Sequence, residues 1–305
     1  MTADAVLTRA VRAEGREHWS RWSLVIASVL AVAGFCWPLI AAALPRDAQA
    51  AIPVLALALV PAVVVAVALS LDRAMHTATT VALLGVLTAV GAAIRIAGTG
   101  VGGLEAVFIV LILAGRVFGA RFGFLLGMLT ILLSSVLWGG IGPWTPFQIF
   151  ACGWVAAGAG LLPRLTAASA RARSFWEMVM LVAYGVLASY AFGLIMNFWF
   201  WPFAVGLGTD ISYVAGAPIG QNLASFGLYS LVTSTLTWDT VRAVTTTVGL
   251  VLVGPAALAA LRRAKVGRAK RRSSGPRGGG KRTRRSTARD AAAVPPTAPR
   301  PSARA

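Results

Sequence analysis

Four charged side chains lie in stretches of the sequence that are otherwise apolar, namely Arg95, Glu105, Asp239 and Arg242. Asp239 and Arg242 are three residues apart and share a helical face, so they can form an ion pair, and Arg95 can pair with Glu105. A charge inside a membrane costs at least ~2.5–3.5 kcal/mol at mid-helix and less near a helix end. These residues therefore either neutralise one another or contact a charged substrate, and the sequence leaves both interpretations open.

Aromatic and amide side chains recur at the level of these charges, which we predict to be the outer ends of membrane helices. A few polar groups among aromatic rings are typical of a small-molecule pocket, although interfacial aromatic residues also form belts that face lipid headgroups. We predict that Arg95 and Arg242 contact an anionic group of the substrate. The further candidate contacts are three rings for stacking (Trp144, Trp201 and Trp238) and three amides for hydrogen bonding (Gln148, Asn197 and Asn222).

The sequence offers little that could support catalysis or metal binding. It has ten acidic residues, and no Ser–His–acid arrangement or acidic metal motif is apparent. Residues 275–281 read GPRGGGK, but Arg282 follows where a phosphate-binding loop has Ser or Thr, and no strand precedes. His18 and His76 are isolated, and both cysteines lie in apolar segments. We predict no catalytic residue, no metal, no cofactor and no enzyme activity.

The composition is that of a membrane protein. The chain is 57% hydrophobic and 12% charged, with a mean hydropathy of +0.76, whereas soluble domains are about 25% charged. Because a spanning helix needs ~20 apolar residues, we predict an all-α integral membrane protein with about eight transmembrane helices. The expected spans are 22–44, 52–71, 78–97, 104–118, 122–138, 147–162, 175–200 and 238–261. Residues 202–237 include an apolar run, 223–232, which we expect to lie flat or re-enter.

The distribution of arginine orients these helices. Only Arg46 lies in a connector that this arrangement places outside. The inner connectors carry six basic residues, Arg73, Arg116, Arg121, Arg164, Arg171 and Arg173. This obeys the positive-inside rule. We therefore predict that both termini are cytoplasmic and that the protein lies in the plasma membrane.

Four segments follow from this arrangement: a cytoplasmic segment at 1–21, two additional helices within 22–72, a six-helix domain at 73–263 and a basic tail at 264–305. From Arg262 onward the chain has fifteen Lys or Arg and one acid. The tail lacks the apolar content to fold, so we predict that it is disordered. It is either a solvated overhang or a clamp on anionic membrane lipids, and we do not predict a nucleic-acid partner.

Small residues recur at four-residue spacing in two places. One series is Gly115, Gly119, Gly123 and Gly127; the other begins with Ala78 and Ala82. On a helix, this spacing forms a flat stripe that lets another backbone approach closely. The stripes either pack within the protein or form a docking face for another membrane protein. The candidate docking residues are Ala78, Ala82, Gly115 and Gly119.

Several stretches resemble the substrate-binding S components of energy-coupling factor (ECF) vitamin transporters of actinobacterial type. The most specific is 139–163, which reads GGIGPWTPFQIFACGWVAAGAGLLP. The others are AGRVFGARFGFLLG (114–127), MNFWFWPF (196–203) and TLTWDTVRAVT (235–245). Together with the helix at 78–97, the resemblance covers about 73–263.

The resemblance implies a six-helix core and a transport mechanism. The S component binds a vitamin or related micronutrient from outside. It then docks on a membrane scaffold (T) subunit that carries two cytoplasmic ATPases, and it topples to deliver the substrate inward. The family's alanine-spaced docking face corresponds by position to Ala78 and Ala82.

Two other functions are compatible with the sequence alone. A scaffold or assembly protein without a small-molecule substrate would need the aromatic residues only as a lipid belt. An enzyme of lipid or isoprenoid metabolism would need an acidic metal cluster or a nucleophile–base pair, and we find neither.

Overall fold

The computed structural model describes residues 25–42, 51, 53–55, 57–62, 78–98, 105–166, 169–206 and 208–273, with side chains as far as Lys265. Within these ranges the regular elements are helices and no strand is present, as predicted. Two short apolar helices, Val25–Phe35 and Pro53–Ala62, lie in the N-terminal part. The other elements are α2 (Trp37–Ala42), α5 (Ala78–Gly98), α6 (Val107–Phe118), α7 (Ala120–Trp138), α8 (Thr145–Leu161), α9 (Ala170–Ala204), α10 (Ile219–Ser230), the π-helix η1 (Leu231–Asp239) and α11 (Thr240–Ser273).

Four helical stretches are long and apolar enough to cross a membrane: Ala78–Gly98, Ala120–Trp138, Ala170–Ala204 and Ile219–Lys265. Their length and composition identify a membrane protein. Two more of the predicted spans, 104–118 and 147–162, correspond to α6 with 12 residues and α8 with 17, which are shorter than these four stretches. The segment 1–21, both chain termini and parts of the two N-terminal runs lie outside the described residues.

The last long helix differs from the prediction. We expected a loop or re-entrant segment up to residue 237 and a new span from Trp238, but the chain is helical without interruption from Ile219 to Lys265. Turn residues that could end a helix lie earlier, between α9 and α10, where Gly208 and Gly216 adopt positive φ. Helix α11 also continues to Ser273, into the segment predicted as a disordered tail; the remainder of that tail lies outside the described residues.

Helices α6, α7 and α8 pack closely because glycines remove side chains from their contact. A Cβ atom at Gly115 or Gly123 would overlap the backbone of Ala156, and one at Gly127 would overlap the backbone of Cys152. The core formed here includes fully buried Phe124. The chain turns from α6 into α7 at Gly119, whose φ of 95° favours glycine.

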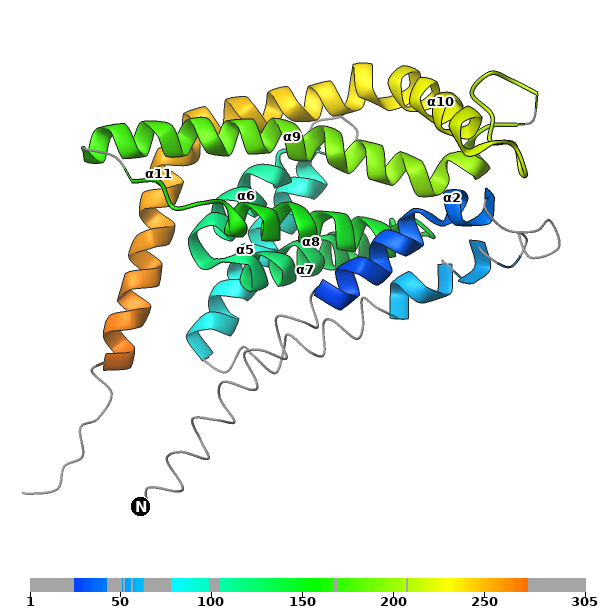
Figure 1. The fold of residues 1–305 in the computed structure, drawn as a ribbon. Coiled ribbons are helices and arrows are strands. Elements are labelled where there is room, and N and C mark those ends of the chain that lie inside the picture. The colour runs from blue at the N-terminus through cyan, green and yellow to red at the C-terminus, as the bar shows by residue number, and fades with distance from the viewer. Residues whose placement is uncertain are drawn as a thin grey trace, which may run out of the picture. The chain divides into compact units, whose positions relative to one another are not determined.

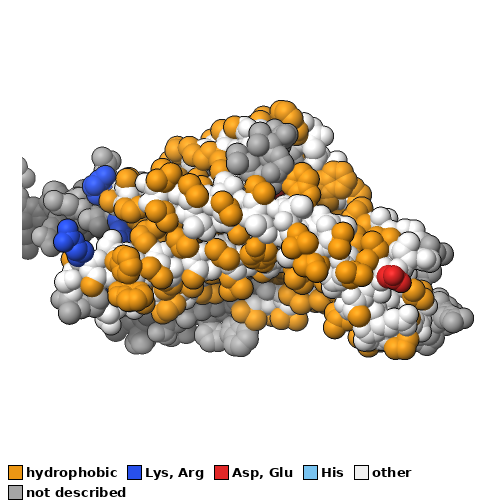
Figure 2. Space-filling view, turned by 90° about the horizontal axis from the view of Figure 1, so that it is seen from above, with side chains coloured by type: hydrophobic (Ala, Val, Ile, Leu, Met, Phe, Trp, Pro, Cys, Tyr) orange, Lys and Arg blue, Asp and Glu red, His pale blue; other side chains and the backbone are white. Residues whose placement is uncertain are grey.

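Helix α9 lies beside α10, η1 and the first part of α11, which run in the opposite direction over the other helices before α11 bends away from α9 (Figure 1). Apolar side chains cover most of the visible face, with Lys and Arg gathered towards one end and an acidic residue near the other (Figure 2). The chain divides into two compact units, Met1–Lys265 and Val266–Ala305. All charged residues of the predicted substrate site belong to the first unit.

Candidate functional site

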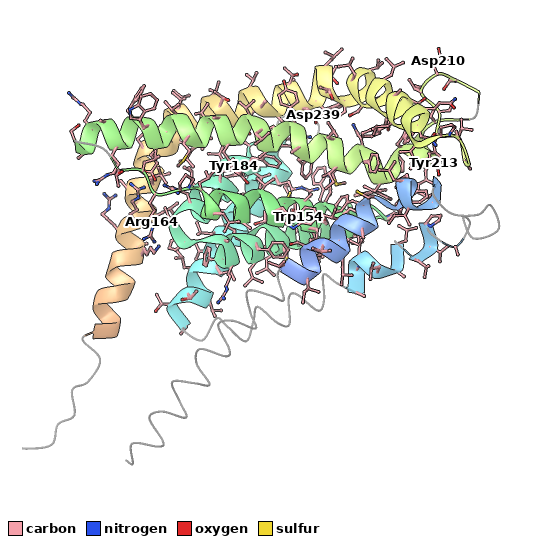
Figure 3. The ribbon with its side chains drawn as sticks, viewed as in Figure 1. Trp154, Arg164, Tyr184, Asp210, Tyr213 and Asp239 are labelled. Carbon is pink, nitrogen blue, oxygen red and sulfur yellow. The ribbon has the colours of Figure 1, made fainter. Side chains whose placement is uncertain are left out.

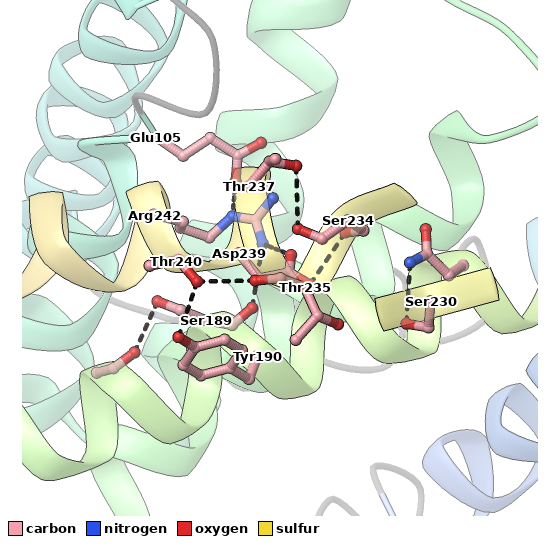
Figure 4. A network of polar contacts seen from close by, with 12 residues as sticks. Glu105, Ser189, Tyr190, Ser230, Ser234, Thr235, Thr237, Asp239, Thr240 and Arg242 are labelled. Carbon is pink, nitrogen blue, oxygen red and sulfur yellow. Dashed lines mark hydrogen bonds and ion pairs between the residues drawn. The ribbon is translucent and has the colours of Figure 1, made fainter. Parts of the chain in front are cut away.

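Arg242 is the centre of a buried ion network at the start of α11 (Figure 4). Its Nε donates a hydrogen bond to Oε2 of Glu105, which precedes α6. Its Nη1 donates to Oδ1 of Asp239 at 2.6 Å and to the carbonyl oxygen of Ser189 on α9 at 3.0 Å. Ser234 donates to the other carboxylate oxygen of Asp239 at 2.9 Å. The network therefore joins α9 and α11 to the start of α6.

The Asp239–Arg242 pair of this network is shielded from solvent. Asp239 is 0% exposed and Arg242 is 6% exposed. The guanidinium also lies over the rings of Phe108 and Phe192, at 5.8 and 4.8 Å from their centroids. A buried charge is stable only when it is paired and hydrogen bonded. The predicted pairing of Asp239 with Arg242 is confirmed, and two carboxylates neutralise Arg242, so it is poorly placed to bind an anionic substrate.

The π-helical turn η1 explains how this network forms within one helix. In a π-helix the repeating hydrogen bond joins residues i and i+5, so residues five apart lie nearly above one another. Ser234 and Asp239 are five apart and are hydrogen bonded, as are the Thr240 hydroxyl and the Thr235 carbonyl, at 2.8 Å. A regular α-helix would separate Ser234 from Asp239 by more than a third of a turn. The wider turn therefore provides Asp239 with its second donor.

Gly193 on α9 makes room for the Asp239 carboxylate. A Cβ atom at Gly193 would overlap the carboxylate oxygens of Asp239. The glycine lies one helical turn after Ser189, whose carbonyl accepts from Arg242. This face of α9 thus provides both an acceptor for the cation and space for the anion.

Arg95 has a different environment, near the end of α5. Its Nη1 donates to Oγ of Ser134 at 3.0 Å, and its Nη2 donates to Oε1 of Gln148 at 3.2 Å. Both partners are neutral, and no carboxylate pairs with Arg95 among the described residues. The predicted ion pair with Glu105 is wrong, because Glu105 is bound by Arg242. Arg95 is partly exposed and retains an uncompensated charge.

Buried hydroxyl groups line the same two helices. The hydroxyls of Thr88 on α5 and of Thr130 and Ser135 on α7 are buried and have no hydrogen-bond partner among the described residues. Thr130 lies one turn before Ser134, whose hydroxyl donates to its carbonyl at 2.7 Å. Buried polar groups are normally satisfied. The Thr130 side chain packs against Gly91 of α5, and we call Arg95 and these buried hydroxyls of α5 and α7 the polar seam.

Trp201 and Asn222 hold the loop between α9 and α10. Trp201 is 1% exposed, and its indole nitrogen donates to the carbonyl of Ile211 at 2.6 Å. Asn222 is also 1% exposed; it accepts from the backbone N–H of Val214 at 3.0 Å and donates to its carbonyl at 2.9 Å. The polar groups of both predicted substrate contacts are engaged by the chain's own backbone, which is a structural role.

The remaining predicted contacts divide between exposed and structural positions. Trp144 and Trp238 are 44% and 51% exposed. Trp144 lies four residues before Gln148 at the start of α8, and hence on the same helical face. Asn197 donates to the hydroxyl of Ser230 at 3.2 Å and so joins α9 to α10. Among Trp144, Trp238 and Asn197, Trp144 is the nearest in sequence to Gln148, which accepts a hydrogen bond from Arg95.

The two small-residue stripes have opposite environments. Ala78 and Ala82 are exposed on α5, and a Cβ atom at Gly85, on the same helix, would meet no other atom. The prediction that Gly115 belongs to a docking face is wrong, because this residue is buried against α8. Gly119 is partly exposed with no atom near its missing Cβ, but its positive φ indicates a turn. The exposed part of the predicted docking face is therefore on α5.

Sequence reasoning missed the neutral partners of the charges: Ser134, Ser189, Gly193 and Ser234. A serine or glycine in an apolar run is common and gives no specific signal. Ser234 gave a weak signal, because this residue precedes Asp239 in a polar run. The π-helical turn that brings Ser234 and Asp239 together could not be predicted from the sequence.

These helices therefore define an apolar helical membrane protein with a buried ion network around Arg242 and a polar seam that retains a positive charge. Within the described residues, no group of three or more His, Cys, Asp or Glu side chains could hold a metal ion. Comparison with known proteins gives no match to a family model, to a curated protein or to a solved structure.

Proposed function

We propose that this protein is the substrate-binding S component of an ECF-type importer in the plasma membrane, with both termini cytoplasmic. It binds a vitamin-like micronutrient from outside and docks on a membrane scaffold subunit driven by two cytoplasmic ATPases. One observation carries the proposal: Arg95 lies on an apolar helix with two neutral partners, Ser134 and Gln148. An ionisable residue in such a position is retained for function.

The polar seam supports a site for an anionic group. Among the described residues, the acceptors of Arg95 are the neutral groups of Ser134 and Gln148, and hydroxyls without a partner, such as that of Thr130, lie on the same helices. A carboxylate or phosphate of the substrate would neutralise Arg95. Trp144, exposed on the same face as Gln148, is placed to stack on a ring. Arg242 is instead a structural residue in this proposal.

The exposed stripe of α5 supports a partner in the membrane. Ala78 and Ala82 have no covering helix among the described residues, and large apolar side chains beside them, such as Val81 and Val86, are 54% and 61% exposed. Small residues on a lipid-facing helix allow close contact with another helix. We assign this face to the scaffold subunit.

The test is substrate binding by the purified full chain, measured by calorimetry against a panel of anionic and uncharged micronutrients. The Arg95→Gln variant should bind an anionic ligand at least about tenfold more weakly, because a hydrogen bond to a charged group contributes ~1.5–3 kcal/mol. Arg171→Gln, an exposed arginine at the start of α9, is the matched control. Equal affinity of the Arg95→Gln variant and the wild type would refute the site.

The same preparation tests the partner. Purification from native membranes should recover one membrane scaffold protein and two ATPases, and the Ala82→Trp substitution on the exposed face should reduce their recovery without changing ligand binding. Recovery of the chain alone under the gentlest conditions would contradict the importer.

A further inference from the structure

A basic pocket of about 550 Å³ lies where the α6–α7 junction, the connector between α8 and α9, and the far part of α11 meet. It is lined by one acid, Glu177, and by five basic residues, Arg116, Arg164, Arg173, Arg262 and Lys265. Arg164 lies at the opposite end of α9 from Asp210 and Tyr213 (Figure 3). Positive-inside reasoning places this end at the cytoplasmic surface.

The inner wall of the pocket is a fixed ion cluster. Arg116 Nε donates to Glu177 at 2.9 Å, and its terminal nitrogens donate to the carbonyls of Leu162 and Pro163 at 2.7 and 3.0 Å. Arg262 donates to both oxygens of Glu177, each at 2.6 Å. One carboxylate is thus shared by two arginines. The cluster holds α6, α9 and α11 together and still has a positive charge.

The rim of the pocket carries two more arginines, Arg164 and Arg173. Both are exposed, and neither side chain makes a hydrogen bond or ion pair within the part of the chain that the structure describes. With Lys265 and the inner cluster, the pocket has four more positive than negative charges. Like charges this close repel one another unless an anion lies between them. Water alone can also solvate two exposed arginines. The residues around the pocket therefore have to show whether a ligand is expected.

The surroundings are those of a membrane interface. Leu161, at the end of α8, is 75% exposed, and Phe175 and Trp176, in the first turns of α9, are 60% and 57% exposed. Exposed aromatic rings beside arginines at the end of a spanning helix are typical of the headgroup level of a bilayer. Basic pockets between membrane helices on this side bind phosphate-bearing lipid headgroups.

We propose that this pocket binds the phosphate of an anionic phospholipid. Arg164 and Arg173 contact the phosphate oxygens, and the Arg116–Glu177–Arg262 cluster is the positioning frame that keeps the pocket open. The acyl chains lie along the exposed apolar surface beside Trp176. This site is separate from the polar seam at Arg95 and does not depend on the transport proposal.

The test compares lipid binding by the full chain in detergent using native mass spectrometry. The probes are phosphatidylglycerol, phosphatidylcholine and, for the phosphate group without acyl chains, glycerol 1-phosphate. The Arg164→Ala/Arg173→Ala variant leaves the inner cluster intact. The matched control is Arg171→Ala, which removes an exposed arginine two residues from Arg173 that does not line the pocket.

We expect phosphatidylglycerol to bind the wild type in preference to phosphatidylcholine. Affinity should fall about 30-fold in the double variant and less than twofold in the control, since each charge near a headgroup contributes ~1 kcal/mol. Glycerol 1-phosphate could instead displace the lipid and lose affinity by the same factor in the double variant. That result would keep the phosphate site but assign it to a soluble phosphate compound. Equal losses in the double variant and the control, or no preference between the lipids, would overturn the proposal.

Discussion

Replacing Arg242 by glutamine tests whether the ion network around this residue stabilises the protein. The substitution removes the cation that neutralises Asp239, whose side chain is 1% exposed and would retain the hydrogen bond from Ser234. Breaking a buried pair by removing one partner destabilises a protein by about 3–5 kcal/mol, because the remaining charge is uncompensated. We expect Arg242→Gln to lose that much free energy of unfolding.

The second substitution of the cycle is Asp239→Asn. In the Asp239→Asn/Arg242→Gln double variant both buried charges are absent, and the side chain of Glu105 is 34% exposed and can be hydrated. The double variant should therefore be more stable than the sum of the single losses predicts, by about 0.5–3 kcal/mol, which is the range for residues in one network.

The measurement is the free energy of unfolding of the purified protein in mixed micelles, followed by circular dichroism as denaturing detergent is added. Tyr190→Phe is a control on the neighbouring surface of α9, because it removes one neutral hydrogen bond, to the Thr240 hydroxyl at 3.0 Å. It should lose about 1 kcal/mol. A loss for Arg242→Gln no larger than that of Tyr190→Phe, or strict additivity in the cycle, would refute the reasoning.

Two further predictions concern glycines. Gly193→Ala should displace the Asp239 carboxylate and destabilise the protein by about 1–3 kcal/mol in the same unfolding assay, whereas an effect below about 0.5 kcal/mol would mean that the carboxylate has another position. Gly127→Ala should destabilise by a similar amount, because its Cβ overlaps the backbone of Cys152. The control Gly85→Ala, which has open space and lies within α5, should be neutral or stabilising by up to about 1 kcal/mol, and the reverse order would contradict the packing described for α7 and α8.

Composition and local spacing were sufficient to predict the helical fold class and one ion pair. The helical class follows from apolar runs, and the Asp239–Arg242 pair follows from a three-residue spacing that places both on one face. The close approach of α7 to α8 also agrees with one interpretation of the glycine spacing, in which Gly123 and Gly127 pack internally.

Contacts between distant segments could not be predicted in this way. Glu105 and Arg242 are 137 residues apart, and Arg95 is 53 residues from Gln148, so no spacing relates them. The uninterrupted helix through Leu231 was missed for a different reason. Its Thr- and Ser-rich stretch has weak helical preference, and hydrogen bonds to the helix's own backbone, such as that from the Thr233 hydroxyl in η1 to the carbonyl of Tyr229 in α10, satisfy those side chains locally.

The contrast between Arg95 and Arg242 gives the strongest argument for a ligand. Both arginines lie on apolar helices, and both need compensation because a charge in that environment is costly. Arg242 has two carboxylates, a carbonyl and two aromatic rings. Arg95 has a hydroxyl and an amide, each contributing one neutral acceptor. The same chain thus neutralises Arg242 and leaves Arg95 with a charge that an anion could neutralise. A substrate should therefore be sought at Arg95 first.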